Sequence, residues 1–593
     1  MNMLNNFFAT SGILSQLGRI DAGVIAVYLI LMIVVGVVFA RYNKTLKDLF
    51  AAGGGAPWWL CGISSYMTFF SAGTFVMWGS MAYCFGWVAI TIQWVIVAGA
   101  AVATFFFAAK WKRIGVDSPI EFLEQRYSFS VRQLYIWIRV PFGVFLAAQA
   151  VYSISILAHD QIGMGISLTA IIVLMTFVII LYTVLGGLWA VLTTDLLQFF
   201  VLTLITLLAL PLALKAIGGI DNFISQAPAG FFNLAQDASA YSEPDKVKFT
   251  WSYFLWWTIL QIFNICTMWE LIQRFQSCES EKKAIKSGWL VTGMYVIMPI
   301  FWLVPLMIFR IITPEFINPL DPLDTKQAEV VFVAMVGRLL PVGLAGLALA
   351  AMFSATGSLV NSALNVMSSV ITKDFYNRLI RKDASDKELV FVGRVAILLL
   401  GLFVILIASQ IYKWGGAVKF FFIMVPITLG PLAVPFLWGV ITKKGGAKTV
   451  WTSVICGVTV SLAVQFILPH YGIESSLAGR LFASTFVPLA VLFVGSFIES
   501  NSSEKSTQVD LLFERMITPL SKYRGEAMCG GAIRLVGFLT MVCGLLLLQI
   551  VWFVESQRLF IVIFSLCVTL WGILVFVRNK KDDKNEQIQD IDS

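Results

Sequence analysis

Long apolar stretches separated by short polar segments dominate the chain from one end to the other. Each stretch runs for about 20 residues, which is the length an α-helix needs to cross the hydrocarbon core of a bilayer. The pattern therefore predicts an all-α, polytopic membrane protein with about fifteen transmembrane helices. The predicted spans are 22–42, 57–85, 86–110, 133–158, 161–185, 188–214, 251–275, 285–312, 341–372, 388–412, 417–442, 446–469, 477–499, 533–553 and 557–577.

Lysine and arginine residues gather in every second loop between these spans. Because basic loops remain on the cytoplasmic side of a membrane, the alternation predicts an N-terminus outside and a C-terminus inside. The polar stretch 500–528 is then a cytoplasmic loop, and 579–593 is a cytoplasmic tail. Basic loops that carry this argument include Arg41, Lys44 and Lys47; Lys110, Lys112 and Arg113; Lys282, Lys283 and Lys286; and Arg578, Lys580 and Lys581.

The composition fits a multi-pass protein of the cell membrane surrounded by lipid. Of the 593 residues 59% are hydrophobic and only 13% are charged, whereas soluble domains are about 25% charged. The eight cysteines show no metal-ligand spacing, and the two histidines stand apart from any HExxH motif. The sequence therefore predicts no enzyme and no cofactor. The net charge of +8 is explained by the basic loops, and no nucleic-acid partner is expected.

Two predicted spans are interrupted by polar residues near their middle. The stretch SSYMTFFSAGT, residues 64–74, lies within span 57–85. Small residues there indicate either close helix packing or a helix that unwinds at mid-depth and turns its carbonyl groups toward a cavity or an ion. Span 251–275 carries Gln261, Asn264 and Thr267 in an otherwise apolar run. Paired interrupted helices favour a binding site at the midplane of the membrane.

Span 341–372 carries a continuous polar stripe. Its polar residues recur at steps of three and four, which places them on one face of a helix. Such a face does not meet lipid, so it either bonds to neighbouring helices or lines a site. The residues of the stripe are Ser354, Ser358, Asn361, Ser362, Asn365, Ser368, Ser369 and Thr372.

Charged residues inside the spans are few. Asp195 lies within span 188–214 and has no basic neighbour in sequence, so we expect a cation to pair with it in the fold. Glu270 and Arg274 are four residues apart on one predicted helix, and this spacing predicts a structural ion pair between them.

Together these segments resemble the sodium/solute symporter family, which includes sodium–sugar, sialic acid and proline cotransporters. The resemblance implies a leucine-transporter-like fold, a five-plus-five inverted repeat whose halves are 57–214 and 251–442. Residues 1–56 would form a leading helix and inner loop, 215–250 an external loop, and 443–578 four additional helices. The matching segments are LFAAGGGAPWWLCGIS, GVDSPIEFLEQRYS, GGLWAVLTTDLLQ, LIQRF, GSLVNSALNVMSSVITKDFY and KKGGA, in this order.

The resemblance also implies that sodium is the coupling ion. Where the family usually supplies a further hydroxyl group after Ser358, this chain has Leu359, so the sodium stoichiometry and the sodium requirement remain open. The residues implied for one sodium are the carbonyl groups of Met67, Phe70 and Ala355 and the hydroxyl group of Ser358. Those implied for a possible second sodium are Thr68, Asp195, Asn361 and Ser362.

For the solute, the resemblance implies a neutral site rich in amide and hydroxyl groups. Such groups both donate and accept hydrogen bonds, which favours a sugar or a similar neutral metabolite. The predicted function is secondary active transport by alternating access, that is, sodium-coupled symport of a small polar solute. The alternatives are a symporter for a monocarboxylate or amino acid, or a sodium-independent facilitator. The implied solute-binding residues are Thr74, Gln93, Gln261, Asn264 and Tyr295, flanked by Phe69, Phe70, Trp94 and Phe263.

Overall fold

The structure of the protein is a computed structural model in which the described residues form helices and connecting turns, with no β-strand among them. Predictions for 41–54, 238–247 and 579–593 fall outside the described residues. The described ranges are 19–40, 55–116, 119–162, 166–183, 188–237, 248–317, 324–341, 343–499, 503–520, 530–553 and 557–578.

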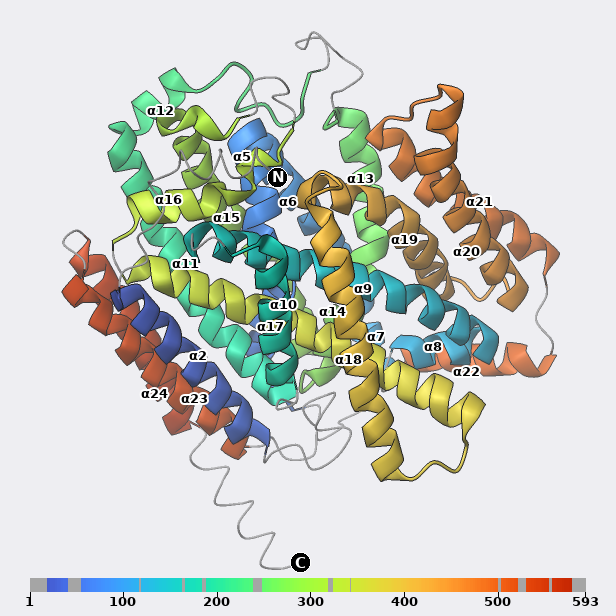
Figure 1. The fold of residues 1–593 in the computed structure, drawn as a ribbon. Coiled ribbons are helices and arrows are strands. Elements are labelled where there is room, and N and C mark those ends of the chain that lie inside the picture. Colours follow the sequence, from blue (N-terminus) through green and yellow to red (C-terminus); the bar gives the residue numbers. More distant parts are fainter. Residues whose placement is uncertain are drawn as a thin grey trace, which may run out of the picture.

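Helices occupy every predicted span (Figure 1). Eleven helices in the described residues are long and apolar enough to cross a membrane, or twelve if α13 and α14 form one span. The number fifteen and the orientation of the termini remain predictions. The helices are α2 (Arg19–Ala40), α4 (Trp58–Met67), α5 (Ser80–Phe85), α6 (Trp87–Val102), α7 (Ala108–Ile114), α9 (Phe129–Ile162), α10 (Leu168–Thr183), α11 (Leu188–Ile217), α13 (Trp251–Cys266), α14 (Trp269–Ser277), α15 (Glu281–Ile312), α17 (Leu344–Val370), α18 (Asp386–Ile411), α19 (Gly416–Ile441), α20 (Ala447–Leu462), α21 (Leu477–Ile498), α23 (Gly530–Leu548) and α24 (Arg558–Arg578).

Both predicted interruptions are confirmed. Helix α4 ends at Met67, and the chain resumes as a π-helical segment, Thr74–Gly79, that leads into α5. Side chains hold this break, since the Ser71 amide donates to the Thr74 hydroxyl over 3.1 Å, and such local bonds compete with the helical pattern. Helices α13 and α14 meet at an angle of 43°, and at this bend the Thr267 hydroxyl donates to the Phe263 carbonyl over 2.8 Å.

The polar stripe lies inside the protein. Helix α17 packs against α2, α9 and α11, and five stripe residues are buried: Ser354, Ser358, Asn361, Ser368 and Thr372. The side chains of Ser362, Asn365 and Ser369 lie outside the described part of the structure.

The leading helix α2 fixes the start of α17. The Asp21 carboxylate accepts hydrogen bonds from the amides of Gly343, over 2.7 Å, and Gly346, over 2.8 Å. A Cβ atom at Gly346 would lie 2.6 Å from the Asp21 carbonyl oxygen, so only glycine permits this approach. The helix that carries the polar stripe is therefore anchored from outside the two predicted repeats.

Short helices occupy parts of the connecting segments: α8 (Pro119–Arg126), α12 (Ile220–Gln226), α16 (Val331–Leu339) and α22 (Ser503–Ile517). Within the predicted cytoplasmic loop 500–528, residues 503–517 form α22, because Val509, Leu512 and Met516 recur at helical spacing and bury one face of this helix. Arg113 of α7 donates to the carbonyl of Ile517 over 2.9 Å, and Lys505 donates to the carbonyl of Gln125 over 2.9 Å. Helix α22 is thus attached at its two ends to α7 and α8.

A buried carboxylate joins the segment before α16 to two long helices. Glu329 accepts a hydrogen bond from the Tyr152 hydroxyl of α9 over 2.6 Å, and another from the Ala417 amide at the start of α19. Gly416 has a φ of +87°, and a Cβ atom there would lie 2.3 Å from a Glu329 oxygen. This glycine allows the carboxylate to reach the first turn of α19.

Candidate functional site

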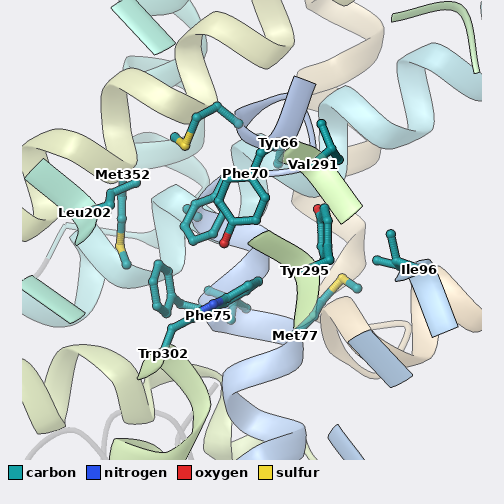
Figure 2. Close-up of a cluster of buried hydrophobic side chains, with 14 of the residues drawn as sticks. Tyr66, Phe70, Phe75, Met77, Ile96, Leu202, Val291, Tyr295, Trp302 and Met352 are labelled. Carbon is teal, nitrogen blue, oxygen red and sulfur yellow. The ribbon is translucent and has the colours of Figure 1, made fainter. Parts of the chain in front are cut away.

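The break after α4 is hydrogen-bonded directly to α17, the helix that carries the polar stripe and is called the stripe helix below. The Ala72 amide donates to the Thr356 hydroxyl over 2.9 Å, and Thr356 lies between Ala355 and Ser358 in sequence. Figure 2 shows Phe70 in the same buried cluster as Met352, which is one helical turn before Ala355. The two halves of the predicted first sodium site therefore lie in one region, and all four of its residues are buried: Met67, Phe70, Ala355 and Ser358.

The carbonyl groups at the break retain acceptor capacity. The Met67 carbonyl accepts one hydrogen bond, from the Phe70 amide over 2.8 Å, and a carbonyl oxygen has two lone pairs. The Thr68 hydroxyl donates back to the Ser64 carbonyl over 2.8 Å, which turns this side chain toward its own helix. Backbone oxygens at the break are therefore better placed than the Thr68 hydroxyl to serve as ion ligands.

The cation expected beside Asp195 is Arg274. The Ser64 hydroxyl donates to Asp195 Oδ2 over 2.5 Å, and Arg274 Nη2 lies 3.8 Å from the same oxygen. Both charged side chains are only 6% exposed. Arg274 Nε also donates to Ser64 Oγ over 3.3 Å. These three side chains form a closed cluster between α11, α14 and the first broken helix, α4.

The predicted pair between Glu270 and Arg274 is wrong. Arg274 turns inward to Asp195, while Glu270 Oε1 lies 3.5 Å from Arg139 Nη2 of α9. The guanidinium of Arg139 also lies 5.2 Å from the ring centre of Trp269. Spacing along one helix predicts which side chains are neighbours on its surface, but a buried carboxylate on another helix is a stronger partner in a medium of low dielectric constant.

The face of α11 that carries Asp195 is directed toward the stripe helix. Gln198, one turn after Asp195, donates from Nε2 to the Ser354 hydroxyl over 2.7 Å. Asn361 of the predicted second sodium site is buried on α17, and the Ser362 side chain lies outside the described part of the structure. Asp195 and the stripe thus occupy neighbouring positions where α4, α11 and α17 meet.

Gln93 and Tyr295, two of the predicted solute ligands, come from adjoining turns of α6 and α15. Trp94, next to Gln93, donates from its indole nitrogen to the carbonyl of Val296 over 3.0 Å. The Tyr295 ring lies 5.0 Å from the ring of Tyr66, and both belong to the buried cluster drawn in Figure 2. Gln93 is 2% exposed, and its amide nitrogen has no hydrogen-bond partner among the described residues. Because a buried donor is normally bonded, this amide is available to a ligand.

The remaining predicted solute ligands lie at the two breaks. Gln261 Oε1 accepts from Asn264 Nδ2 over 3.0 Å, and Asn264 lines a cavity of about 40 Å³ together with Thr267 and Arg139. The Thr74 hydroxyl is already used by the break, since it accepts from the Ser71 amide.

Phe263 is predicted to flank the solute-binding residues. Its side chain lines a separate groove between α13, α19 and α21. Asn264 lines the small cavity at the bend between α13 and α14, so successive side chains at the end of α13 line different cavities. The place of Phe263 beside the solute remains a prediction.

Aromatic side chains fill the space between the first break and α16. The Phe70 and Trp302 rings lie 4.8 Å apart, and the Phe75 and Phe332 rings 4.1 Å apart. Figure 2 shows Phe70, Phe75 and Trp302 packed in one cluster. Sequence reasoning missed Trp302 and Phe332 because each sits in an apolar stretch with no polar or small-residue pattern that marks a site, and it missed Thr356 because this residue lies off the polar stripe.

Comparison with known proteins places the chain in a family. Residues 49–457 match the sequence profile of the sodium:solute symporter family. The chain belongs to this family. It is 26% identical to the sodium/sialic acid symporter SiaT of Proteus mirabilis over 83% of this chain and 99% of that relative. It is 25% identical to the sodium/glucose cotransporter of Vibrio parahaemolyticus, over 77% of this chain and 87% of that one. It is 26% identical to the sodium/myo-inositol cotransporter 2 of Sus scrofa, over 76% and 71%.

The symporter also has the fold of a solved relative. A sodium-coupled sialic acid symporter in a substrate-bound, outward-open state superimposes with a TM-score of 0.67 at 23% identity, covering 82% of this chain and 99% of that one. The predicted all-α, leucine-transporter-like fold is confirmed. The symporter is a multi-pass protein of the cell membrane, and its relatives are transporters rather than enzymes. The bounds of the two repeats remain a prediction.

Proposed function

We propose that this protein couples the entry of sodium to the uptake of a small, neutral, polar solute such as a sugar or polyol. The observation that carries the sodium part is the bond between the Ala72 amide and the Thr356 hydroxyl. It joins an unwound stretch with carbonyl oxygens to a hydroxyl-bearing helix inside the membrane. Hard oxygen ligands of this kind are what alkali and alkaline-earth cations prefer.

In this proposal the first sodium is bound by the carbonyl groups of Met67, Phe70 and Ala355 and by the Ser358 hydroxyl. A second sodium is bound by Asp195 with the Thr68 carbonyl, Asn361 and Ser362. Both described contacts of Asp195 are made by Oδ2, so Oδ1 is the oxygen assigned to sodium. Asp195 would then serve two cations, one of them the fixed guanidinium of Arg274.

We propose a neutral solute because of the chemistry of the predicted solute-binding residues. The predicted solute ligands Gln93, Gln261, Asn264, Thr74 and Tyr295 carry no charge at neutral pH. Two arginines near these residues, the partly exposed Arg139 and the buried Arg274, each face a carboxylate. A polyhydroxyl solute can satisfy the amide nitrogen of Gln93 without bringing a charge into the site.

A carboxylate solute is the second candidate, and one observation favours it. Arg139 lines the cavity at the second break next to Asn264 and Thr267. A carboxylate there would have to compete with Glu270, which lies 3.5 Å from Arg139. This places a neutral solute ahead of an acidic one.

The mechanism we propose is alternating access. Sodium holds the first break against α17 while the solute binds between the broken helices. The aromatic cluster of Phe70, Phe75 and Trp302 closes over it, and movement of one repeat against the other opens the opposite side. Each sodium ion that crosses carries about 2.3 kcal/mol per 100 mV of membrane potential.

Uptake into proteoliposomes tests both parts of the proposal. Uptake of labelled glucose, myo-inositol, sialic acid and proline is measured under sodium, lithium, potassium and proton gradients. A sodium gradient should be required for accumulation, and a neutral polyol should be preferred. Equal uptake in all gradients would instead identify a facilitator, and preference for an acidic solute would favour the Arg139 alternative.

Two variants on one helix test the role of Gln93. Gln93→Leu should weaken solute binding about tenfold or more, since removal of one partner of a buried hydrogen bond costs about 1–3 kcal/mol. Thr91→Val is the matched control, because the Thr91 hydroxyl bonds to its own helix at the carbonyl of Trp87. If both variants bind solute like the wild type, Gln93 does not belong to the site.

A further inference from the structure

The groove that Phe263 lines is separate from the cavity that Asn264 lines at the bend between α13 and α14. It has a volume of about 380 Å³ and lies between the end of α13, the end of α19 and the last turns of α21. Its wall is apolar along Leu489 and Phe493, and its polar residues, Thr442, Lys444 and Ser496, lie where α19 and α21 end. We propose that this groove binds one anionic phospholipid.

The order of side chains along the groove matches the order of chemical groups in a lipid. Leu489 lies nine residues before the end of α21, which is roughly 14 Å along a helix. The groove therefore runs from the predicted membrane interface into the hydrocarbon layer. Acyl chains fit the deeper wall at Leu489 and Phe493, and a headgroup fits the end at Lys444.

Charge complementarity selects an anionic headgroup. The Lys444 ammonium lies 5.5 Å from the ring centre of Phe497, and no carboxylate forms an ion pair with it in the described part of the chain. The neighbouring Lys443 is paired with Asp510 at 2.6 Å. Lys444 thus offers its full charge to the groove.

The acidic group closest in sequence to the groove is already bonded elsewhere. Glu499 accepts hydrogen bonds from the Gly446 amide over 3.1 Å, and from the Thr449 amide and hydroxyl over 2.7 Å each. On the other side of the same loop, the buried Arg126 guanidinium donates to the carbonyls of Thr442 and Lys444, over 2.9 and 3.0 Å. The headgroup end of the groove is therefore positive, because the nearby Glu499 is already engaged by backbone amides and by the Thr449 hydroxyl.

The groove also touches an element that the transport cycle moves. The Phe263 carbonyl accepts a hydrogen bond from the Thr267 hydroxyl at the bend between α13 and α14. The part of the groove wall that Phe263 forms is therefore the last turn of α13 before this bend. A lipid that packs against Phe263 supports one geometry of that turn. We expect the lipid to stabilise the protein and to alter the rate of uptake.

Binding is tested on the full chain in mixed micelles with phosphatidylglycerol or phosphatidylcholine of identical acyl chains. Phosphatidylglycerol should raise the melting temperature in a concentration-dependent manner, and native mass spectrometry should retain one such lipid per chain. Phosphatidylcholine should do neither. An equal effect of both lipids would overturn the proposal, because the headgroup charge would then not be recognised.

Two pairs of variants locate the effect. Lys444→Glu should abolish the increase in melting temperature caused by phosphatidylglycerol. The control is Lys448→Glu, which reverses the charge of an exposed lysine that does not line the groove. This control should keep the increase. Leu489→Trp should fill the groove and also abolish the shift, whereas Val494→Trp, on the lipid-exposed side of α21, should not. An unchanged shift in Lys444→Glu and Leu489→Trp, or a cross-linked dimer through α21 that excludes lipid, would refute the assignment.

Discussion

Asp195→Asn is the change that most directly separates an ion site from a structural contact. Asparagine keeps the size of the side chain and an oxygen that can accept a hydrogen bond from the Ser64 hydroxyl, but it removes the negative charge. Arg274 then remains buried without a counter-charge. At the observed separation of 3.8 Å the attraction between the two charges is about 4 kcal/mol for an effective dielectric constant of about 20.

That estimate agrees with the roughly 3–5 kcal/mol by which loss of one partner from a buried ion pair destabilises proteins. We therefore expect a clearly lower melting temperature for Asp195→Asn and for Arg274→Gln. The double variant, Asp195→Asn with Arg274→Gln, should recover most of the loss because no unpaired charge is left inside. Melting of the purified protein, followed by intrinsic tryptophan fluorescence, measures all four forms.

Sodium distinguishes the two roles of the carboxylate. If Asp195 also binds sodium, Arg274→Gln should be stabilised by sodium chloride more strongly than the wild type, relative to potassium chloride at the same concentration. The double variant should remain deficient in sodium-driven uptake, with at least a tenfold loss of apparent sodium affinity, even though its stability recovers. Wild-type sodium dependence of uptake in the double variant would refute a sodium role for Asp195 and leave only the pair with Arg274.

Three further changes test other contacts. Burial raises the pKa of Glu329 to about 7 from an ordinary value of 4.5, although the hydrogen bonds from Tyr152 and Ala417 lower it. Between these two pKa values the folded state binds more protons than the unfolded state. The stability of the fold should therefore fall as the pH rises through this window. Glu329→Gln should remove that part of the pH dependence from melting curves taken between pH 5 and 8, and an unaltered profile would count against it. Gly416→Ala should destabilise the protein by roughly 1–3 kcal/mol, since its φ is +87° and its Cβ atom would meet Glu329, whereas Gly337→Ala, which meets nothing within 4 Å, should be neutral in the same denaturation assay. Arg139→Gln should change the rate of solute release more than sodium affinity in single-turnover uptake, because Arg139 lines the cavity at the second break; a pure loss of sodium affinity would contradict this.

The spans and their interruptions could be predicted from sequence because they depend on local composition. A run of Ser, Thr and Gly in an apolar stretch marks residues 64–74, and Gln261, Asn264 and Thr267 mark the second break. The same reasoning placed Ser354, Ser358 and Asn361 on one buried face, because helical periodicity reports burial directly.

Partners across the fold could not be predicted in the same way. Asp195 and Arg274 are 79 positions apart, and only the packing of α11 against α4 and α14 brings them together. Periodicity shows that a side chain is buried and leaves its contact open. It therefore suggested Glu270 as the partner of Arg274, and it gave no reason to single out Thr356, which lies off the stripe. Helix α22 was missed because its apolar residues are too few to resemble a membrane span, although their spacing is helical.

Because α22 is attached at both ends, it is a suitable place for a fluorescent label that reports movement. Its first turn is bonded to α8 through Lys505 and its last turn to α7 through Arg113, so displacement of α7 relative to α8 must bend this helix or release one end. Leu511 on α22 is 52% exposed and accepts a label without disturbing that packing. If the transport cycle displaces α7 relative to α8, a dye at this position should change brightness with each turnover, and single turnovers of one transporter could be counted in real time.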